Sequence, residues 1–345
     1  MTTVIIGAGA IGLLIAGRLS QTANHITLLA RPSFIERAQT HGVFLEQDHT
    51  KQSIDKLTIV GHPKEIRQTN DSVEMAIVCV KGYDTVGVLE TLAELNPKHI
   101  LTLQNGIGNE EILIEHFGPA CVLSGAITTS VEVEAPNHIR ITKSGGIGLA
   151  PIGEHQSLQK WSSHFTKAAF DVRTYQDYRA MKWSKALINI LGNATAAILD
   201  MPAEVVYSHQ RLVALERQAF LEALHVMDKL AIKPVNLPRY RAALLAQAMR
   251  HIPLPVLHPI LRRLVTGGRG GKPPSLHLEL LRGNQRSEGQ FLYGAIAYEA
   301  QKCGLLAPVN QELWSILQGI ATQQIDWSIY RHQPDKLVAA IKQQS

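Results

Sequence analysis

A glycine-rich hexad directly follows a short apolar run at the start of the chain. Val4–Ile6 leads into Gly7-Ala8-Gly9-Ala10-Ile11-Gly12, and an apolar helical pattern continues from Leu13. Glycines at this spacing permit a tight turn, a close backbone approach to a pyrophosphate and close packing of helix on strand, with the helix amino terminus facing the negative charge. The alternative is a glycine-rich helix start that binds nothing. We expect a dinucleotide site that comprises Gly7, Gly9, Ala10, Ile11 and Gly12.

The remainder of the first half alternates short apolar runs with amphipathic segments. The runs expected to be strands are Thr3–Ile6, His25–Leu29, Met75–Val80, Ile100–Leu103 and Cys121–Thr128. Strand–helix alternation predicts an α/β fold with a doubly wound parallel sheet of the Rossmann type. Two later runs, His138–Thr142 and Ile147–Ile152, flank two glycines, and we expect them to form an antiparallel hairpin appended to that sheet.

Long helical patterns dominate the second half. They cover Tyr178–Leu199, Ala203–Leu230, Leu237–His251, Ser275–Arg282 and Ser287–Cys303. Leucines recur at helical spacing in the second of these, which is typical of a core-facing stripe. The sequence therefore predicts a nucleotide-binding Rossmann-like domain over 1–177 and an all-helical substrate-binding domain over 178–345. The glycine run Gly267–Gly271 is expected to be a flexible joint.

The end of the second predicted strand indicates which dinucleotide binds. Sites specific for NAD usually carry an acid there, whereas this strand ends at Leu29 and continues with Ala30 and Arg31. A guanidinium can bind the 2′-phosphate, which favours NADP(H). Lys81, after the Met75–Val80 strand, would add a second positive charge near the ribose. The alternative for both side chains is an ordinary solvated cation.

One helical segment of the second half carries a polar stripe on an otherwise apolar pattern. Lys185, Asn189 and Asn193 are spaced four and four, so they are expected to line one side of a single helix. Asparagines are poor helix formers and are costly to bury without partners. The stripe suggests a cleft for a small anion with a carbonyl group, in which the lysine donates a proton. A solvent-exposed stripe without a role is the alternative.

Composition excludes several other classes of protein. The chain has 34 lysines and arginines against 29 acids, a formal charge of +5, and the basic residues are spread along its length. No basic face alternates with aromatic residues, so we expect no nucleic-acid partner. The three cysteines lack metal or redox spacing, and no uncharged apolar stretch reaches membrane-spanning length. We therefore expect a cytoplasmic protein without a metal or a membrane partner. A homodimer is possible.

Several motifs, taken in order, resemble those of the ketopantoate (2-dehydropantoate) 2-reductase family. They are the GAGAIG hexad, Lys81, Gln104-Asn105-Gly106-Ile107-Gly108-Asn109-Glu110, Trp183-Ser184-Lys185 with Asn189 and Asn193, Lys272-Pro273-Pro274-Ser275, Arg282-Gly283, and Glu288 with Gly294. The resemblance runs over nearly the whole chain. It implies NADPH-dependent reduction of 2-dehydropantoate to pantoate, as in pantothenate biosynthesis, by an oxidoreductase with a small 2-oxo acid as substrate.

The resemblance also implies two catalytic residues. The lysine that matches Lys185 is the general acid that protonates the 2-oxo group. The glutamate that matches Glu288 lies near this lysine and helps to set its position and ionisation. A local alternative exists for Glu288, because Ser287-Glu288 looks like a helix start, where an acid is favoured by the helix dipole.

Further positions are implied to bind the ligands. The residue that matches Asn105 lies between nicotinamide and substrate, those that match Asn189 and Asn193 hold the substrate, and the serine that matches Ser275 contacts its carboxylate. Arg31 and Lys81 match positions that contact the 2′-phosphate.

The sequence departs from the family pattern where the substrate would be shaped. Gln290 and Tyr293 replace an acid and an asparagine, and Glu279 stands where an aspartate is usual. A sibling reductase or dehydrogenase that acts on another 2-oxo or 2-hydroxy acid is therefore one alternative. A second is a regulator that senses NADPH without turnover, although such a protein would have no need of a proton donor at Lys185.

Overall fold

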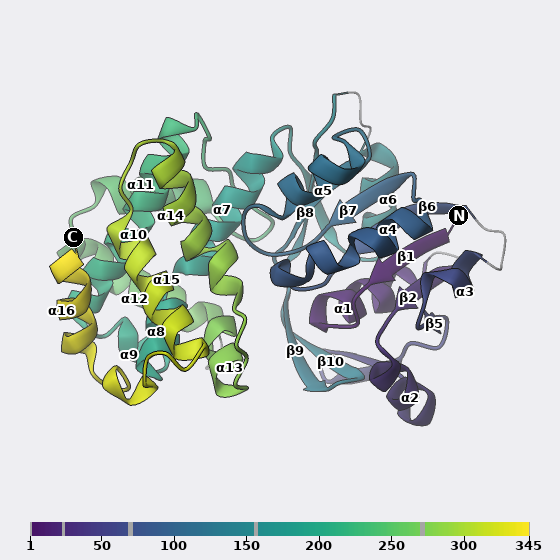
Figure 1. Ribbon diagram of the computed structural model, residues 1–345, viewed down its shortest axis with the longest axis horizontal. Coiled ribbons are helices and arrows are strands. Elements are labelled where there is room, and N and C mark those ends of the chain that lie inside the picture. Colours follow the sequence, from purple (N-terminus) through teal and green to yellow (C-terminus); the bar gives the residue numbers. More distant parts are fainter. Residues whose placement is uncertain (1, 23–24, 68–71, 155–157, 270–272, 345) are drawn as a thin grey trace. The chain divides into compact units, whose positions relative to one another are not determined.

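The chain forms two compact units in the computed structural model, which describes residues 2–22, 25–67, 72–154, 158–269 and 273–344. The first unit comprises Met1–Asn105, Asn109–Met181 and the short stretch Leu237–Tyr240. The second comprises Gly106–Gly108, Lys182–Asn236 and Arg241–Ser345. The first unit is a mixed α/β structure and the second is helical (Figure 1), so the predicted fold class is confirmed.

An eight-stranded sheet forms the centre of the first unit. Its strands in spatial order are β12 (Asp171–Thr174), β11 (Gly146–Pro151), β8 (Val122–Ile127), β7 (His99–Thr102), β6 (Val73–Val78), β1 (Thr2–Ile6), β2 (Ile26–Leu29) and β5 (Thr58–Val60). All neighbours are parallel except β8 and β11. The chain leaves β1 toward β2 and later returns on the other side at β6, so β1 marks the point at which the strand order reverses. In doubly wound sheets, ligands bind beside that point.

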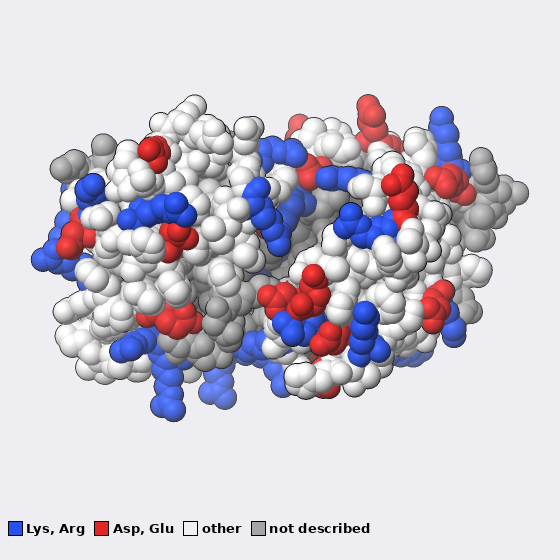
Figure 2. Space-filling model, turned by 90° about the horizontal axis from the view of Figure 1, so that it is seen from below, with Lys and Arg blue, Asp and Glu red and all other residues white. Residues whose placement is uncertain are grey.

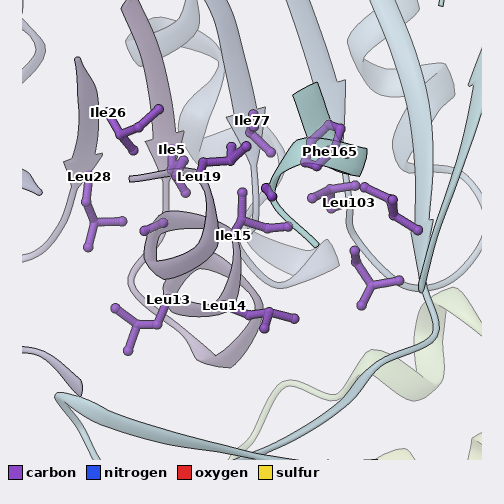
Figure 3. Close-up of a cluster of buried hydrophobic side chains, with 14 of the residues drawn as sticks. Ile5, Leu13, Leu14, Ile15, Leu19, Ile26, Leu28, Ile77, Leu103 and Phe165 are labelled. Atoms are coloured by element: carbon purple, nitrogen blue, oxygen red, sulfur yellow. The ribbon is translucent and has the colours of Figure 1, made fainter. Parts of the chain in front are cut away.

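Helices cover both faces of this sheet. They are α1 (Ala10–Leu19), α2 (Pro32–His41), α3 (Pro63–Arg67), α4 (Leu89–Leu95), α5 (Asn109–Phe117) and α6 (Gln159–Lys167), with short 3-10 turns η1 (Gly82–Asp84) and η2 (Val86–Val88). Ile5 belongs to the same apolar cluster as Ile15 and Leu19 of α1, which lie on the side of the helix that faces the sheet (Figure 3). Val4 and Ile6 pack on the opposite face against α4 and α5. This alternation is the two-residue period of a strand that is buried on both sides.

A second, four-stranded sheet packs on α1, and it corrects the hairpin prediction. Its order is β4 (Thr50–Ser53), β3 (Phe44–Gln47), β10 (His138–Lys143) and β9 (Ser130–Ala135). The two runs that we expected to pair lie in different sheets: β10 pairs with β9, and β11 pairs with β8. The glycines between them do not form a hairpin turn. A Cβ on Gly145 would lie 2.3 Å from the backbone of Thr128, and one on Gly146 would lie 2.1 Å from the Asp171 carbonyl oxygen, so the glycines allow the chain to pass from one sheet to the other.

The second unit consists of helices. They are α7 (Tyr178–Ile190, which begins in the first unit), α8 (Ala194–Leu199), α9 (Ala203–Val206), α10 (Gln210–Lys229), α11 (Ala242–His251), α12 (Leu254–Arg269), α13 (Ser275–Leu281), η3 (Glu288–Phe291), α14 (Tyr293–Lys302), α15 (Pro308–Ala321), η4 (Trp327–Ile329) and α16 (Pro334–Gln344). The expected joint at Gly267–Gly271 is wrong in its first part, because α12 continues to Arg269. Residues 270–272 lie outside the described ranges. Among the described residues, no helix has the length and apolarity needed to cross a membrane.

The predicted helix Tyr178–Leu199 is two helices. Gly192 adopts a left-handed conformation with φ of +57°, which ends α7 and starts a new direction for α8. Buried partners hold this junction: the Glu216 carboxylate accepts hydrogen bonds from the Gly192 N–H (2.5 Å) and the Thr195 hydroxyl (2.6 Å). The Tyr293 hydroxyl donates to the Ile190 carbonyl (2.5 Å) and accepts from the Ala194 N–H (3.0 Å). Side chains distant in sequence therefore decide where the helix breaks.

Substitution of the glycines in the hexad tests the packing of α1 on β1. A Cβ on Gly12 would lie 1.8 Å from the Gly7 carbonyl oxygen, whereas one on Gly9 meets nothing within 4 Å. We expect Gly12→Ala to lower the free energy of unfolding by about 1–3 kcal/mol, and Gly9→Ala by less than about 1 kcal/mol. Urea denaturation followed by circular dichroism measures both. Equal losses in the two variants would contradict this packing.

A second variant tests the junction of α7 and α8. Tyr293→Phe removes a fully buried hydroxyl together with its hydrogen bonds to Ile190 and Ala194, and we expect a loss of about 1–3 kcal/mol in the free energy of unfolding. Tyr298→Phe, on the exposed side of the same helix α14, is the matched control and should change it by less than about 0.5 kcal/mol. A similar small change in both would show that the Tyr293 hydroxyl does not hold the junction.

Candidate functional site

The carboxyl ends of four parallel strands meet at one edge of the large sheet. Ile6 of β1 is in register with Leu29 of β2 and Val78 of β6, and Val78 is in register with Thr102 of β7. The backbone ladder continues just past the strands, since the Gly7 N–H donates to the Leu29 carbonyl at 3.1 Å. The segments that follow these strands carry the glycine hexad, Arg31, Lys81 and Asn105, so the first unit brings the predicted cofactor residues to one edge.

The hexad forms a tight turn between β1 and α1. Gly7 has φ of +106°, a conformation that favours glycine. Gly12 lies so close to the Gly7 carbonyl that a side chain at residue 12 would not fit. Gly9 is exposed and is the N-cap residue of α1, with open space where a side chain would be. As a glycine, this N-cap residue has no side chain to cap the α1 amino terminus, and no acid occupies the first turn of α1. Backbone N–H groups in this arrangement are suited to an anion.

Arg31 and Lys81 begin the segments that follow β2 and β6. Arg31 is the N-cap residue of α2 and its side chain is 86% exposed. Lys81 is exposed and is the N-cap residue of η1, and Asp84 lies three residues further on. The Arg31 guanidinium Nη2 lies 3.8 Å from Asp84 Oδ2. An ion pair this exposed is weak, so Arg31 can exchange this partner for another anion.

Asn105 follows β7 in a segment with several buried polar groups. It is half-buried, and its carbonyl accepts a hydrogen bond from the Asn109 side-chain amide at 2.9 Å. Asn109 is fully buried at the start of α5. The backbone position of Asn105 is therefore fixed from the first turn of a helix.

Lys185 and Asn189 lie one turn apart on α7 in the second unit, and both are half-buried. Burial and, to a smaller extent, the charge of the nearby Lys182 together lower the pKa of the Lys185 ammonium to about 8. A lysine with this pKa can give up a proton near neutral pH more easily than an ordinary lysine.

Asn193 is not the third member of that helical stripe. It lies beyond Gly192, as the N-cap residue of α8, because the helix ends before it. Its buried carboxamide accepts a hydrogen bond from the Leu276 N–H (3.2 Å) and donates to the Asn189 carbonyl (3.0 Å) and to the Ser275 hydroxyl (3.4 Å). Asn193 thus joins α7 to the start of α13, where the exposed Ser275 is the first residue. Three of the predicted substrate residues are linked by this one side chain.

Glu288 is buried at the start of η3, directly after the N-cap residue Ser287. The Glu279 carboxylate accepts hydrogen bonds from the Ser287 hydroxyl (2.9 Å) and the Glu288 N–H (3.1 Å). The helix start that we considered as the local alternative is therefore present. The residues that depart from the family pattern have different surroundings. Glu279 accepts the hydrogen bonds that hold this turn, and Tyr293 holds the junction of α7 and α8. Gln290 is exposed.

Sequence reasoning missed the buried polar residues that hold these segments in place. In the first unit they are Thr85, Gln104 and Asn109, and in the second Glu216. Their signal in the sequence is a polar residue within an apolar segment, as for Glu216 after Leu215. Such a signal predicts a buried partner but does not identify it.

On the face shown in Figure 2, lysines and arginines are mixed with acidic side chains. Within the described part of the chain, no group of three or more histidine, cysteine or acidic side chains has the arrangement of a metal site.

Comparisons with known proteins match this chain in both halves. The model of the family "Ketopantoate reductase PanE/ApbA" matches residues 3–154, and that of its C-terminal domain matches residues 177–321. A 2-dehydropantoate 2-reductase of Pyrococcus abyssi is 24% identical over 92% of this chain and 97% of its own length. One from Halobacterium salinarum is 24% identical, with coverages of 92% and 98%.

Solved structures have the same fold. The ketopantoate reductase of Ralstonia eutropha superposes with a TM-score of 0.79 at 24% identity, covering 94% of this chain and 99% of its own. A D-mandelate dehydrogenase, solved with NADH and anilino(oxo)acetate, gives the same TM-score and coverages at 19% identity. Because the two family models together span most of the sequence, the chain belongs to the ketopantoate reductase family of oxidoreductases.

Proposed function

We propose that this protein uses NADPH to reduce 2-dehydropantoate to pantoate. The observation that carries the proposal is the joint presence of two arrangements in a member of this family. One is a glycine turn at the strand edge of the first unit, with open space beside Gly9 at the amino terminus of α1. The other is a lysine with a lowered pKa on α7, one turn from Asn189 in the second unit.

The residues at the strand edge fit a dinucleotide. Gly9 leaves space for a pyrophosphate at the N–H groups of α1. Arg31 is exposed and only weakly paired, which suits a 2′-phosphate, and Lys81 supplies a second cation on the next segment. The NADPH, when bound, supplies the hydride. Asn105 would orient the nicotinamide and the substrate.

In this proposal, Lys185 donates the proton to the substrate oxygen and Glu288 helps to set the position and ionisation of the lysine. Asn189, Asn193 and Ser275 bind the substrate. Because the Asn193 carboxamide is already bonded to the end of α7 and to the start of α13, we assign it chiefly the orientation of Ser275. The substrate carboxylate would then meet the exposed Ser275 hydroxyl at the amino end of α13.

Loss of NADPH absorbance with 2-dehydropantoate, beside a panel of other 2-oxo acids, tests this function. We expect the fastest reduction with 2-dehydropantoate, and a loss of about 100-fold to 10,000-fold in kcat for Lys185→Ala. Lys185→Arg should be nearly as slow, since a guanidinium keeps the charge but does not release a proton. Both variants should still bind NADPH, measured by its fluorescence, because the hexad lies in the other unit.

The same assay distinguishes the alternatives. Fast reduction of a different 2-oxo acid, still dependent on Lys185, would support the proposed reaction type but show that the substrate is another 2-oxo acid. NADPH binding without reduction of any acid in the panel would refute the enzyme and favour a sensor.

The pH dependence tests the role of Lys185 separately. Proton donation requires the ammonium form, and the pKa of Lys185 is about 8. The kcat/KM for reduction should therefore be flat below pH 8 and fall about tenfold per pH unit above it. Oxidation of pantoate with NADP⁺ requires the neutral amine and should show the opposite trend. Parallel profiles in both directions would contradict a lysine acid.

Cofactor preference tests Arg31 and Lys81. We expect Arg31→Ala and Lys81→Ala each to weaken NADPH binding by about 10-fold to 100-fold, because each removes a charge-assisted contact. The dissociation constant for NADH should change by less than about threefold. Arg37→Ala, an exposed arginine on the same helix α2, is the control and should alter neither. Equal losses for NADPH and NADH would show that these cations do not recognise the 2′-phosphate.

A further inference from the structure

The segments that carry Lys81 and Asn105 are joined by a buried polar network. Its centre is Thr85, which is fully buried and follows η1. The Thr85 hydroxyl accepts a hydrogen bond from the Gln104 amide nitrogen at 2.8 Å. It lies 2.6 Å from the Gly82 carbonyl and 2.9 Å from Asn109 Oδ1. Its single hydrogen is shared between these two acceptors.

One arm of the network leads to Lys81. The Gln104 side-chain amide has two hydrogens, and it donates one to Thr85 and one to the Lys81 carbonyl at 3.3 Å. Its oxygen accepts from the Thr102 hydroxyl at 3.0 Å. Every polar atom of the Gln104 side chain is therefore used. The backbone of Lys81 is anchored to the end of β7, although the Lys81 side chain is exposed.

The other arm leads to Asn105. Asn109 presents its oxygen to Thr85 and its amide nitrogen to the Asn105 carbonyl at 2.9 Å. The two ends of one carboxamide thus join the segment after β6 to the segment after β7. Because Asn109 is fully buried at the first turn of α5, it cannot follow a movement of either segment without losing a bond.

We propose that Thr85, Gln104 and Asn109 are positioning residues that set the two ends of the cofactor site. This inference rests on the proposed function, which assigns the 2′-phosphate to Lys81 and the nicotinamide to Asn105. The Gln104 arm sets the discrimination between NADPH and NADH through Lys81. The Asn109 arm sets the turnover rate through Asn105. Thr85 holds both arms.

The geometry also explains why these residues must be polar in a buried position. A network in which every donor and acceptor is paired fixes a single arrangement, whereas loss of one member leaves a buried group unpaired and favours rearrangement. Apolar residues could fill the same space, but they would not fix the Lys81 and Asn105 backbones relative to one another. A role in stability alone predicts no difference between the two arms.

Variants of the full-length protein separate the arms. Thr85→Val keeps the shape of the side chain and removes the hydroxyl, so we expect about a tenfold loss in the ratio of the NADH and NADPH dissociation constants and about a tenfold loss in kcat. Thr85→Ser restores the hydroxyl and should recover both. Asn109→Asp keeps the acceptor for Thr85 but loses the donor to Asn105, and an acid is tolerated at a helix start. We expect it to lower kcat about tenfold with the dissociation-constant ratio unchanged.

The readouts are NADPH and NADH fluorescence titrations and steady-state rates with 2-dehydropantoate, each beside a thermal melt. If Thr85→Val lowers only the melting temperature, the network is structural and the inference is wrong. If Asn109→Asp alters discrimination as much as turnover, the arms are not separate and the inference is also wrong. If the wild-type protein binds both dinucleotides but reduces nothing, the proposed function fails, while the effect of Thr85 on discrimination is still decided by binding. If it binds neither, both proposals fail.

Discussion

The first unit is built around the close approach of the Gly7 carbonyl to the backbone of Gly12. A side chain at residue 12 would lie 1.8 Å from that oxygen, so only glycine lets α1 lie this close to β1. That approach places the amino terminus of α1 at the carboxyl edge of the sheet. The far side of α1 faces the four-stranded sheet, and a Cβ on Gly17 would lie 2.8 Å from Ile54, which directly follows β4. One close approach therefore organises both sheets around a single helix.

Buried polar residues then fix the segments that the apolar core leaves undetermined. Hydrophobic packing is not directional, whereas hydrogen bonds are. In the first unit, Thr85 and Gln104 fix the loops at the strand edge. In the second, Glu216 and Tyr293 fix the break between α7 and α8, and Asn193 fixes the start of α13. The residues to which we assign chemistry lie next to these fixed points.

The predictions that succeeded from sequence depend on local patterns, and those that failed depend on distant partners. The α/β fold follows from the hexad and from strand-length apolar runs, which are visible within a few residues. The pairing of β10 with β9 could not be predicted from the sequence, because the residues of a strand do not specify which other strand pairs with it. Likewise, Tyr293 lies about a hundred residues from the helix break that it holds. For the candidate site, the strand-end positions of the hexad, Arg31, Lys81 and Asn105 could be predicted from the sequence, while the buried partners Thr85 and Glu216 could not.

Hydrogen–deuterium exchange with and without NADP⁺ tests whether the strand edge of the first unit binds NADP(H). If it does, NADP⁺ should slow exchange at the amides of the hexad, of the segment after β2, and of the segments after β6 and β7 that carry Lys81 and Asn105. Exchange on the opposite, amino-terminal edge of the sheet should show no change of comparable size. Protection at that opposite edge, or exchange that NADP⁺ leaves unchanged throughout the first unit, would show that the dinucleotide does not bind there.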